Sequence, residues 1–288
     1  MKSQYLLGID TGGTYTDAVL FDETQGVVAK AKSLTTRHDL AVGISGAVDA
    51  VLRQADVPVS AISLVSLSTT LATNALVEGQ GGRAGLVMIG FGPEDLKRDG
   101  LDQALGGDPV IFLPGGHNVH GHETPLDMTA LEEALPELSK TVSSFAVAGY
   151  FAVRNPAHEI RVRQRIHEVS HLPVTCSHEL SSKLGGPRRA LTTLLNARLV
   201  SMIDRLVGAC EDFLIRRGID APMMVVRGDG ALIAASEAKI RPIETILSGP
   251  AASLVGARYL TGLDNGVVSD IGGTTTDVAV LDGGRPRL

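Results

Sequence analysis

Aspartate, glycine and threonine recur with one spacing at two distant places in the sequence. Residues 8–20 read GIDTGGTYTDAVL, and residues 269–281 read SDIGGTTTDVAVL. At an offset of 260 residues, six of the eight positions from 10 to 17 are identical in the second copy. The identical pairs are Asp10 and Asp270, Gly12 and Gly272, Gly13 and Gly273, Thr14 and Thr274, Thr16 and Thr276, and Asp17 and Asp277. Chance is a poor explanation for so close a repeat.

These residue types suit a bound metal-nucleotide. Paired glycines lack Cβ atoms, so backbone N–H groups can approach an anion closely, and the four threonines add hydroxyl donors. Carboxylates beside a phosphate would repel it unless a hard cation such as Mg²⁺ lies between them. We therefore predict that Asp10 and Asp270 hold a hard cation such as Mg²⁺, directly or through water. The glycines and threonines of both copies are predicted to bind the phosphates of a metal-nucleotide.

The flanking residues predict which elements position this chemistry. In each copy an apolar, β-rich run leads into the first Asp, and a second β-rich run follows the Gly-Gly pair. This pattern indicates strand, tight turn and strand, with no helix at the turn, unlike the Walker loop and the dinucleotide fingerprint. The alternative is two ordinary glycine-containing hairpins. For one copy the two interpretations are equal, and the repeat favours the functional one.

Two further strand ends offer candidate contacts to substrate or phosphate. A strand over residues 62–66 leads to hydroxyl residues before a short helix over 72–77, which makes Thr69, Thr70 and Asn74 candidates. The equally weighted alternative is a helix cap. A strand over residues 223–227 ends in a sharp turn, which adds Gly228 and Asp229 to the candidates.

Other polar clusters favour structural interpretations. Residues 90–127 have little periodicity and are predicted to form an insertion or flap. Within it His117, His120, His122 and Glu123 could bind a metal, but three histidines on an irregular loop are predicted to be solvated rather than a structural zinc site. The run at 177–179, Ser-His-Glu, lacks a nucleophile elbow and is predicted to be a turn. A helix from Asn155 to Ser170 and a long core helix over 187–217 are also expected.

Composition limits the class of protein. The chain has 288 residues, of which 44% are hydrophobic, and a formal net charge of −6. No basic footprint for nucleic acid or a membrane surface is present, so neither partner is expected. Cys176 and Cys210 are far apart and are predicted to be free thiols in a reducing compartment. Without a signal peptide or a spanning segment in this sequence, a cytoplasmic location is expected.

Taken together, the two hairpins and a small-residue helix before the second resemble the actin, heat-shock chaperone and sugar-kinase superfamily of two-lobed ATP-binding proteins. More closely, the chain resembles the N-terminal part of the hydantoinase A and 5-oxoprolinase family. The matching stretches are IDTGGTYTDAVL, STTLATNAL, RNPAHE, ALTTLLNARL, VVRGDGALI, RPIETILSGPAASLVGA and DIGGTTTDVAVL. The resemblance thus covers nearly the whole length.

The resemblance implies an α/β actin-like ATPase (ribonuclease H-like) fold, with one mixed-sheet lobe, its flanking helices and the first hairpin of a second lobe. It divides the chain into an N-terminal region with the inserted subdomain (1–182), a core helix, strand and connector helix (183–265), and the start of the second lobe (266–288). The superfamily's adenine-contacting segment would follow the second hairpin, so this chain is expected to be a fragment or to be completed by another chain.

The family's activity is ATP-dependent ring opening of a cyclic amide such as a hydantoin or 5-oxoproline, by phosphorylation of the carbonyl oxygen. The implied cofactors are ATP and Mg²⁺, with Asp10 and Asp270 holding the Mg²⁺ through water and Asp17 and Asp277 supporting them. The implied partners are the small cyclic amide and a companion hydantoinase-type subunit in an oligomer. Two alternatives stay open, namely the ATP-using subunit of a ketone carboxylase and a non-catalytic module gated by nucleotide.

Overall fold

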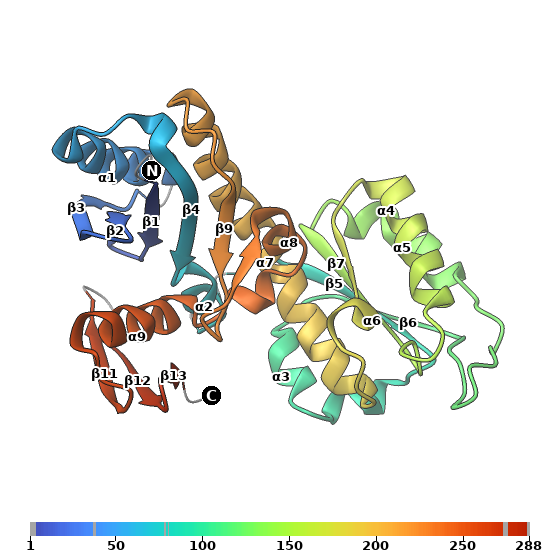
Figure 1. The fold of residues 1–288 in the computed structure, drawn as a ribbon. Helices are drawn as coiled ribbons and strands as arrows, with labels where there is room; N and C mark the ends of the chain where they lie inside the picture. The colour runs from blue at the N-terminus through green and yellow to red at the C-terminus, as the bar shows by residue number, and fades with distance from the viewer. Residues whose placement is uncertain (1–3, 37–38, 78, 80, 273–275, 287–288) are drawn as a thin grey trace. The chain divides into compact units, whose positions relative to one another are not determined.

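A computed structural model describes residues 4–36, 39–77, 79, 81–272 and 276–286. The chain forms two compact units (Figure 1). Unit 1 comprises residues 1–79 and 203–288, and unit 2 comprises residues 80–202. The boundaries expected after residues 182 and 265 divide the chain differently and remain predictions.

Unit 1 is built on a six-stranded mixed sheet with the order β10-β9-β4-β1-β2-β3. The first three strands form an antiparallel meander, and β4 and β9 extend it in parallel from the other side of β1. The strands are β1 (Tyr5–Thr11), β2 (Tyr15–Asp22), β3 (Gly26–Leu34), β4 (Ile62–Thr69), β9 (Met223–Val226) and β10 (Leu232–Ala234). Side chains of β1 and β2 alternate between buried and partly exposed, as expected when one sheet face packs on a core.

Helices cover this sheet and lead to a second, smaller one. Helix α1 (Leu40–Ala55) packs on β2 and β3 and begins at Asp39, whose carboxylate accepts the Ala41 N–H at 3.1 Å. The remaining elements are η1 (Val59–Ala61), α2 (Leu71–Val77), α8 (Ala235–Ile240), η3 (Pro242–Thr245) and α9 (Ser248–Thr261). The second sheet is antiparallel, with β11 (Gly266–Ile271), β12 (Thr276–Asp282) and β13 (Arg285–Pro286), and α9 packs against it.

Unit 2 is a parallel α/β layer structure around the strand order β6-β5-β7-β8. Its strands are β5 (Ala84–Ile89), β6 (Val110–Leu113), β7 (Ser144–Gly149) and β8 (Val174–Cys176). Its helices are η2 (Pro93–Lys97), α3 (Leu101–Leu105), α4 (Thr129–Leu138), α5 (Ala157–Ser170) and α6 (Ser177–Leu180), and it shares α7 (Gly186–Arg216) with unit 1. Every residue of β5 and β7 is buried, as in parallel sheets covered on both faces.

Side chains of β5 alternate between two cores in unit 2. Val87 and Ile89 join the core under α4 and α5, whereas Leu86 and Met88 join the core under α3 and α7. The alternation follows from the two-residue period of a strand. Because the four strands are parallel, their carboxyl ends lie at the same edge of the sheet.

Two sequence-based expectations are wrong in unit 2. Residues 90–127, predicted to be an insertion or flap with little periodicity, contain η2, α3 and the edge strand β6. The four-residue apolar run of β6 is too short to show a period. Residues 177–179 form the start of helix α6 rather than a turn. Among the described residues, no helix is long and apolar enough to cross a membrane.

Candidate functional site

The first hairpin has the predicted strand, turn and strand, because β1 ends at Thr11 and β2 begins at Tyr15. The Gly12 N–H donates to the Tyr15 carbonyl at 2.9 Å and closes the turn. A Cβ atom on Gly12 would lie 3.1 Å from that oxygen, which is why glycine is favoured. Since the hairpin uses this N–H, a phosphate would have to bind other donors of the turn.

The two carboxylates of the first hairpin share one face of the sheet. Asp10 and Asp17 lie directly opposite each other across the β1–β2 ladder. One Asp10 oxygen accepts the Ser68 hydroxyl at 2.6 Å, and Asp17 lies 3.4 Å from the Lys32 ammonium. Burial raises the pKa of Asp10, the Ser68 hydrogen bond opposes that shift, and the charges of Asp17 and Asp270 raise it further. The carboxylates of both repeats are thus close enough to interact.

The threonines of the first hairpin have unequal roles. Thr16 lies on the face opposite to Asp17, is fully buried, and its hydroxyl lies 3.0 Å from the Thr35 hydroxyl. Strand alternation therefore directs this side chain into the core, which favours a structural contact over the predicted phosphate contact. The Thr14 carbonyl accepts the Thr35 N–H at 2.9 Å. Thr11 is also buried, and its hydroxyl has no hydrogen-bond partner among the described residues.

The second hairpin repeats the carboxylate arrangement. Asp270 and Asp277 lie opposite each other across β11 and β12. The Ser253 hydroxyl of α9 donates to Asp270 at 2.7 Å, and burial together with Asp270 raises the pKa of Asp277. Gly272 and Thr276 are exposed. The predicted phosphate contacts Gly273 and Thr274 lie outside the described residues.

The hydroxyls after β4 join the start of α9 to the first hairpin. Thr69 donates its hydroxyl to the Thr11 carbonyl at 3.0 Å and accepts the Leu71 N–H at 3.0 Å. The Ser248 hydroxyl donates to the Thr69 carbonyl at 2.8 Å. A Cβ atom on Gly249 would lie 2.6 Å from the Thr70 methyl carbon. The Thr69 hydroxyl thus has two backbone partners beside the start of α2, and Thr70 packs against α9. Substrate or phosphate contacts at Thr69 and Thr70 remain predictions.

The other substrate candidates have identifiable local contacts. The Asn74 N–H donates to the Thr70 carbonyl at 2.9 Å within α2, and its side chain is half-buried. A Cβ atom on Gly228 would lie 2.3 Å from the Ile246 carbonyl oxygen, so this position requires glycine. Asp229 accepts the Ala231 N–H at 3.0 Å in an Asx turn. Substrate contacts at Asn74, Gly228 and Asp229 remain predictions.

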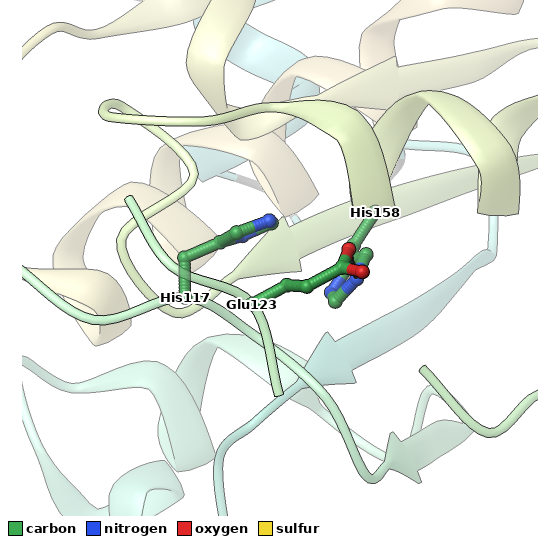
Figure 2. Close-up of side chains that lie close together, drawn as sticks. All are labelled: His117, Glu123 and His158. Carbon is green, nitrogen blue, oxygen red and sulfur yellow. Dashed lines mark hydrogen bonds and ion pairs between the residues drawn. The ribbon is translucent and has the colours of Figure 1, made fainter. Parts of the chain in front are cut away.

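In unit 2, the loop histidines do not converge on one another. His117 is buried, whereas His120 and His122 are exposed. His117 and Glu123 instead approach His158 of α5 (Figure 2). Burial and the neighbouring His158 lower the pKa of His117.

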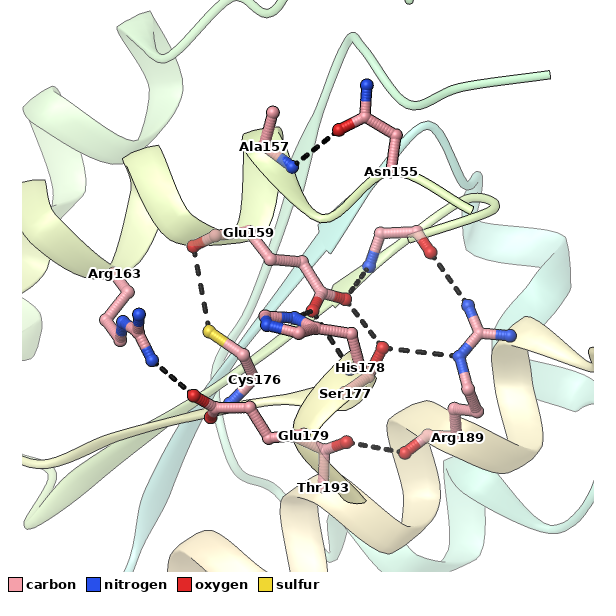
Figure 3. Close-up of polar contacts among 11 residues, drawn as sticks. Asn155, Ala157, Glu159, Arg163, Cys176, Ser177, His178, Glu179, Arg189 and Thr193 are labelled. Atoms are coloured by element: carbon pink, nitrogen blue, oxygen red, sulfur yellow. Dashed lines mark hydrogen bonds and ion pairs between the residues drawn. The ribbon is translucent and has the colours of Figure 1, made fainter. Parts of the chain in front are cut away.

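A buried carboxylate missed by sequence reasoning organises the neighbouring elements. Glu159 is fully buried and accepts the Gly149 N–H and the Ser177 hydroxyl, each at 2.6 Å (Figure 3). Its other oxygen accepts the His178 N–H at 3.1 Å and lies 2.5 Å from His178 Nδ1. Arg189 donates to the Gly149 carbonyl at 2.9 Å. The RNPAHE stretch, which places Glu159 in the first turn of a helix, was the available signal.

Both cysteines are free, as predicted, and both are buried. Burial raises the pKa of Cys176, and it raises the pKa of Cys210 to about 12. Thiols with pKa values raised this far stay protonated at neutral pH and are poor nucleophiles and metal ligands.

Comparison with known proteins identifies the family. Residues 6–170 match the hydantoinase/oxoprolinase N-terminal region, and residues 189–288 match the hydantoinase/oxoprolinase domain. The chain belongs to the hydantoinase/oxoprolinase family. The caprolactamase subunit alpha of Pseudomonas jessenii is 30% identical over 100% of this chain and 45% of its own length. The acetophenone carboxylase gamma subunit of Aromatoleum aromaticum is 30% identical over 96% of this chain and 42% of its own.

Solved structures of the family confirm the fold class. Nucleotide-free acetone carboxylase matches with a TM-score of 0.84 at 23% identity, over 99% of this chain and 44% of that one. ATP-dependent caprolactamase from Pseudomonas jessenii matches with a TM-score of 0.72 at 28% identity, over 96% of this chain and 43% of that one. The fold is the actin-like ATPase type with a mixed sheet and flanking helices. This hydantoinase/oxoprolinase chain spans less than half the length of these relatives.

Proposed function

We propose that this chain carries the phosphate-binding hairpins of an enzyme that uses ATP to open a cyclic amide such as a hydantoin or 5-oxoproline. The observation that carries the proposal is that both repeats present a carboxylate pair in unit 1, with Asp270 close enough to Asp10 to raise its pKa. Four carboxylates gathered around glycine turns favour a phosphate whose charge is balanced by a cation.

The residues fit a hydrated Mg²⁺. Asp10 is a partly buried carboxylate whose only hydrogen bond among the described residues comes from Ser68, and burial raises its pKa despite that bond and the charge of Lys32. Asp10 and Asp270 would hold Mg²⁺ through water, and the ion would neutralise charge on the phosphates. Asp17 and Asp277 flank them across each ladder.

The proposed reaction follows from the stability of an amide. The carbonyl oxygen of the cyclic amide attacks the γ-phosphorus of ATP, the bond to ADP breaks, and an imidate phosphate forms. Water then adds to the activated carbon, and the ring C–N bond breaks to leave a protonated amine and an acyl phosphate. A second water adds to the acyl carbon, and the C–O bond to phosphate breaks to give the ring-opened amino acid and inorganic phosphate. In such a transfer the protein mainly positions groups and balances charge.

A ketone carboxylase is the second candidate, since the acetone carboxylase structure has a TM-score of 0.84 with this chain. There ATP would activate an enolate or bicarbonate, and hairpins that contact only the nucleotide serve both reactions. Both candidates accommodate a companion subunit, because relatives are named as subunits.

ADP release discriminates these functions. The longer family protein with its companion subunit is assayed with hydantoin, 5-oxoproline and caprolactam, and separately with ketones and bicarbonate. Stimulation by a cyclic amide supports the proposal, and stimulation only by ketone with bicarbonate supports the carboxylase. Slow turnover indifferent to every substrate would contradict both and indicate a nucleotide-gated module.

A substitution tests the role of the second hairpin. Asp270→Asn should lower turnover by roughly 100- to 1,000-fold, the range for removing one charge-stabilising group from an active site. Because Asp270 is exposed, the melting temperature should hardly change. Unchanged turnover would remove this carboxylate from the site.

A further inference from the structure

We propose that His117, Glu123 and His158 form a binding site for a divalent transition-metal ion within unit 2. One nitrogen of each imidazole and one carboxylate oxygen lie within 4.8 Å of one another. Two imidazole nitrogens with one carboxylate oxygen suit zinc, cobalt or iron(II), whereas Mg²⁺ and Ca²⁺ prefer oxygen ligands. The site is independent of the proposed nucleotide chemistry.

The topology of unit 2 places this cluster where ligands collect. The sheet order β6-β5-β7-β8 reverses between β5 and β7, so connections leave these two strands on opposite sides. Ligands of open parallel sheets bind at the carboxyl ends of strands beside such a reversal. The His117 N–H donates to the carbonyl of Tyr150, the residue after β7, at 3.0 Å. His158 is the second residue of α5, which follows β7.

One ring nitrogen of the cluster, His117 Nε2, lacks a hydrogen-bond partner among the described residues. His117 is 3% exposed, and its Nε2 has no hydrogen-bond partner among the described residues. Leaving a buried polar nitrogen unpaired is costly, and such atoms are rare in folded proteins. The His117 ring lies 4.3 Å from the His158 ring, with the Glu123 carboxylate alongside (Figure 2). A metal ion at this position would satisfy the nitrogen.

The hydrogen bonds of His158 show which contacts of its ring would change on metal binding. Its Nδ1 accepts the Gly116 N–H at 3.0 Å, so the proton of the neutral ring is on Nε2, which lies 3.2 Å from Glu123. That proton occupies the direction in which a metal would bind. Coordination of the neutral ring through Nε2 moves the proton to Nδ1 by exchange with solvent, and this breaks the Gly116 hydrogen bond. One backbone hydrogen bond is a small loss beside a metal–imidazole bond.

A metal ion would reach the cluster from solvent on the side of the Glu123 carboxylate. The Glu123 side chain is 61% exposed, whereas His158 is 2% exposed. Three protein ligands leave a fourth position open, as in catalytic rather than structural zinc sites. His120 and His122 take no part, so the expectation that the loop is not a three-histidine zinc site is compatible with this proposal.

The test is metal binding by residues 1–288 after treatment with a chelator. Co²⁺ is titrated by visible absorption and Zn²⁺ by calorimetry, with millimolar Mg²⁺ present to occupy the hairpin carboxylates. One equivalent of Co²⁺ should bind with a tetrahedral or five-coordinate spectrum, and the Gly116 amide resonance should shift. Glu123→Gln and His117→Gln should each weaken binding by more than about 100-fold, because even outer-shell partners are worth 10- to 100-fold.

His120→Gln is the matched control, since His120 is on the same loop but exposed. It should bind Co²⁺ like the unsubstituted chain. Glu123→Gln changes an exposed side chain, so it keeps the test valid if His117→Gln misfolds. Absence of stoichiometric binding, or binding unaffected by Glu123→Gln, would overturn the proposal. Loss of binding with His120→Gln would instead assign the metal to the loop surface.

Discussion

At the scale of single residues, Asp10 is where stability and the proposed function oppose each other. Its folded pKa is raised above the usual value by burial, so its ionised form destabilises the fold. The penalty is present above the folded pKa, and it is relieved as the pH falls through that pKa. A carboxylate that is destabilising without a cation is expected if the proposed function rather than stability determines the residue.

We therefore expect Asp10→Asn to raise the free energy of unfolding of the nucleotide-free chain at pH 7 and to abolish Mg-ATP binding. The Asn side-chain oxygen can still accept the Ser68 hydroxyl, so the change removes mainly charge. Calorimetric melting at pH 7 and pH 5 measures the effect, and the advantage of the variant should shrink at the lower pH. Asp17→Asn, at a more exposed carboxylate paired with Lys32, is the control. A less stable Asp10→Asn variant at pH 7 would contradict this account.

Glu159 shows the opposite case, a buried carboxylate whose hydrogen bonds are complete. Four donor contacts from Gly149, Ser177 and His178 surround its two oxygens. Glu159→Gln places an amide NH₂ against these donors, so we expect a loss of about 3 kcal/mol in the free energy of unfolding. Urea denaturation measures it. Glu168→Gln, at an exposed position of the same helix, should change stability by less than about 0.5 kcal/mol.

At the scale of elements, the start of α9 depends on the absence of one side chain. A Cβ atom added to Gly249 would lie 2.6 Å from the Thr70 methyl carbon. A Cβ atom added to Gly256 of the same helix would have no neighbouring atom within 4 Å. The two glycines have equal helix propensity but unequal surroundings. The contact between the start of α9 and the junction of β4 with α2 is therefore tightly packed.

This difference gives a matched pair of substitutions. Gly249→Ala should destabilise unit 1 by about 1–3 kcal/mol, the usual effect of overpacking. Gly256→Ala should stabilise it by about 0.5–1 kcal/mol, because alanine is the better helix former. Thermal melting of both variants is the measurement. Equal effects of the two substitutions would show that the packing against Thr70 can relax.

At the scale of the whole molecule, the second sheet exposes apolar side chains on β11 and β12. Val267, Ile271 and Val278 are 71%, 78% and 66% exposed. A small sheet with so little packing has limited stability of its own in water. Its hairpin is consequently a weak clamp for a nucleotide unless other protein covers it.

We expect residues 1–288 alone to bind Mg-ATP weakly and to hydrolyse little of it. A chain that includes the additional length found in the relatives should restore both activities, because the second hairpin would then be held in place. Titration calorimetry with Mg-ATP on both chains is the measurement. Micromolar or tighter binding by residues 1–288 would show that the nucleotide site is complete without further protein.

The sequence alone determined the hairpins, because strand periodicity, a glycine turn and a 260-residue repeat are local or countable features. The strand–turn–strand of residues 5–22 and the pairing of Asp10 with Asp17 follow from them. Family resemblance supplied the fold class for the same reason, since its motifs are contiguous. The free cysteines also followed from the sequence, because the two residues are far apart in it.

Only the tertiary structure decided which polar side chains come together. The Thr16 side chain points into the core because side chains alternate between the two faces of a strand. The Thr69 hydroxyl hydrogen-bonds to two backbone groups. His117 and His158 are 41 positions apart and meet because β6 and β7 flank β5 in one parallel sheet. No local pattern encodes such a meeting, since strand order depends on packing energies summed over the whole unit.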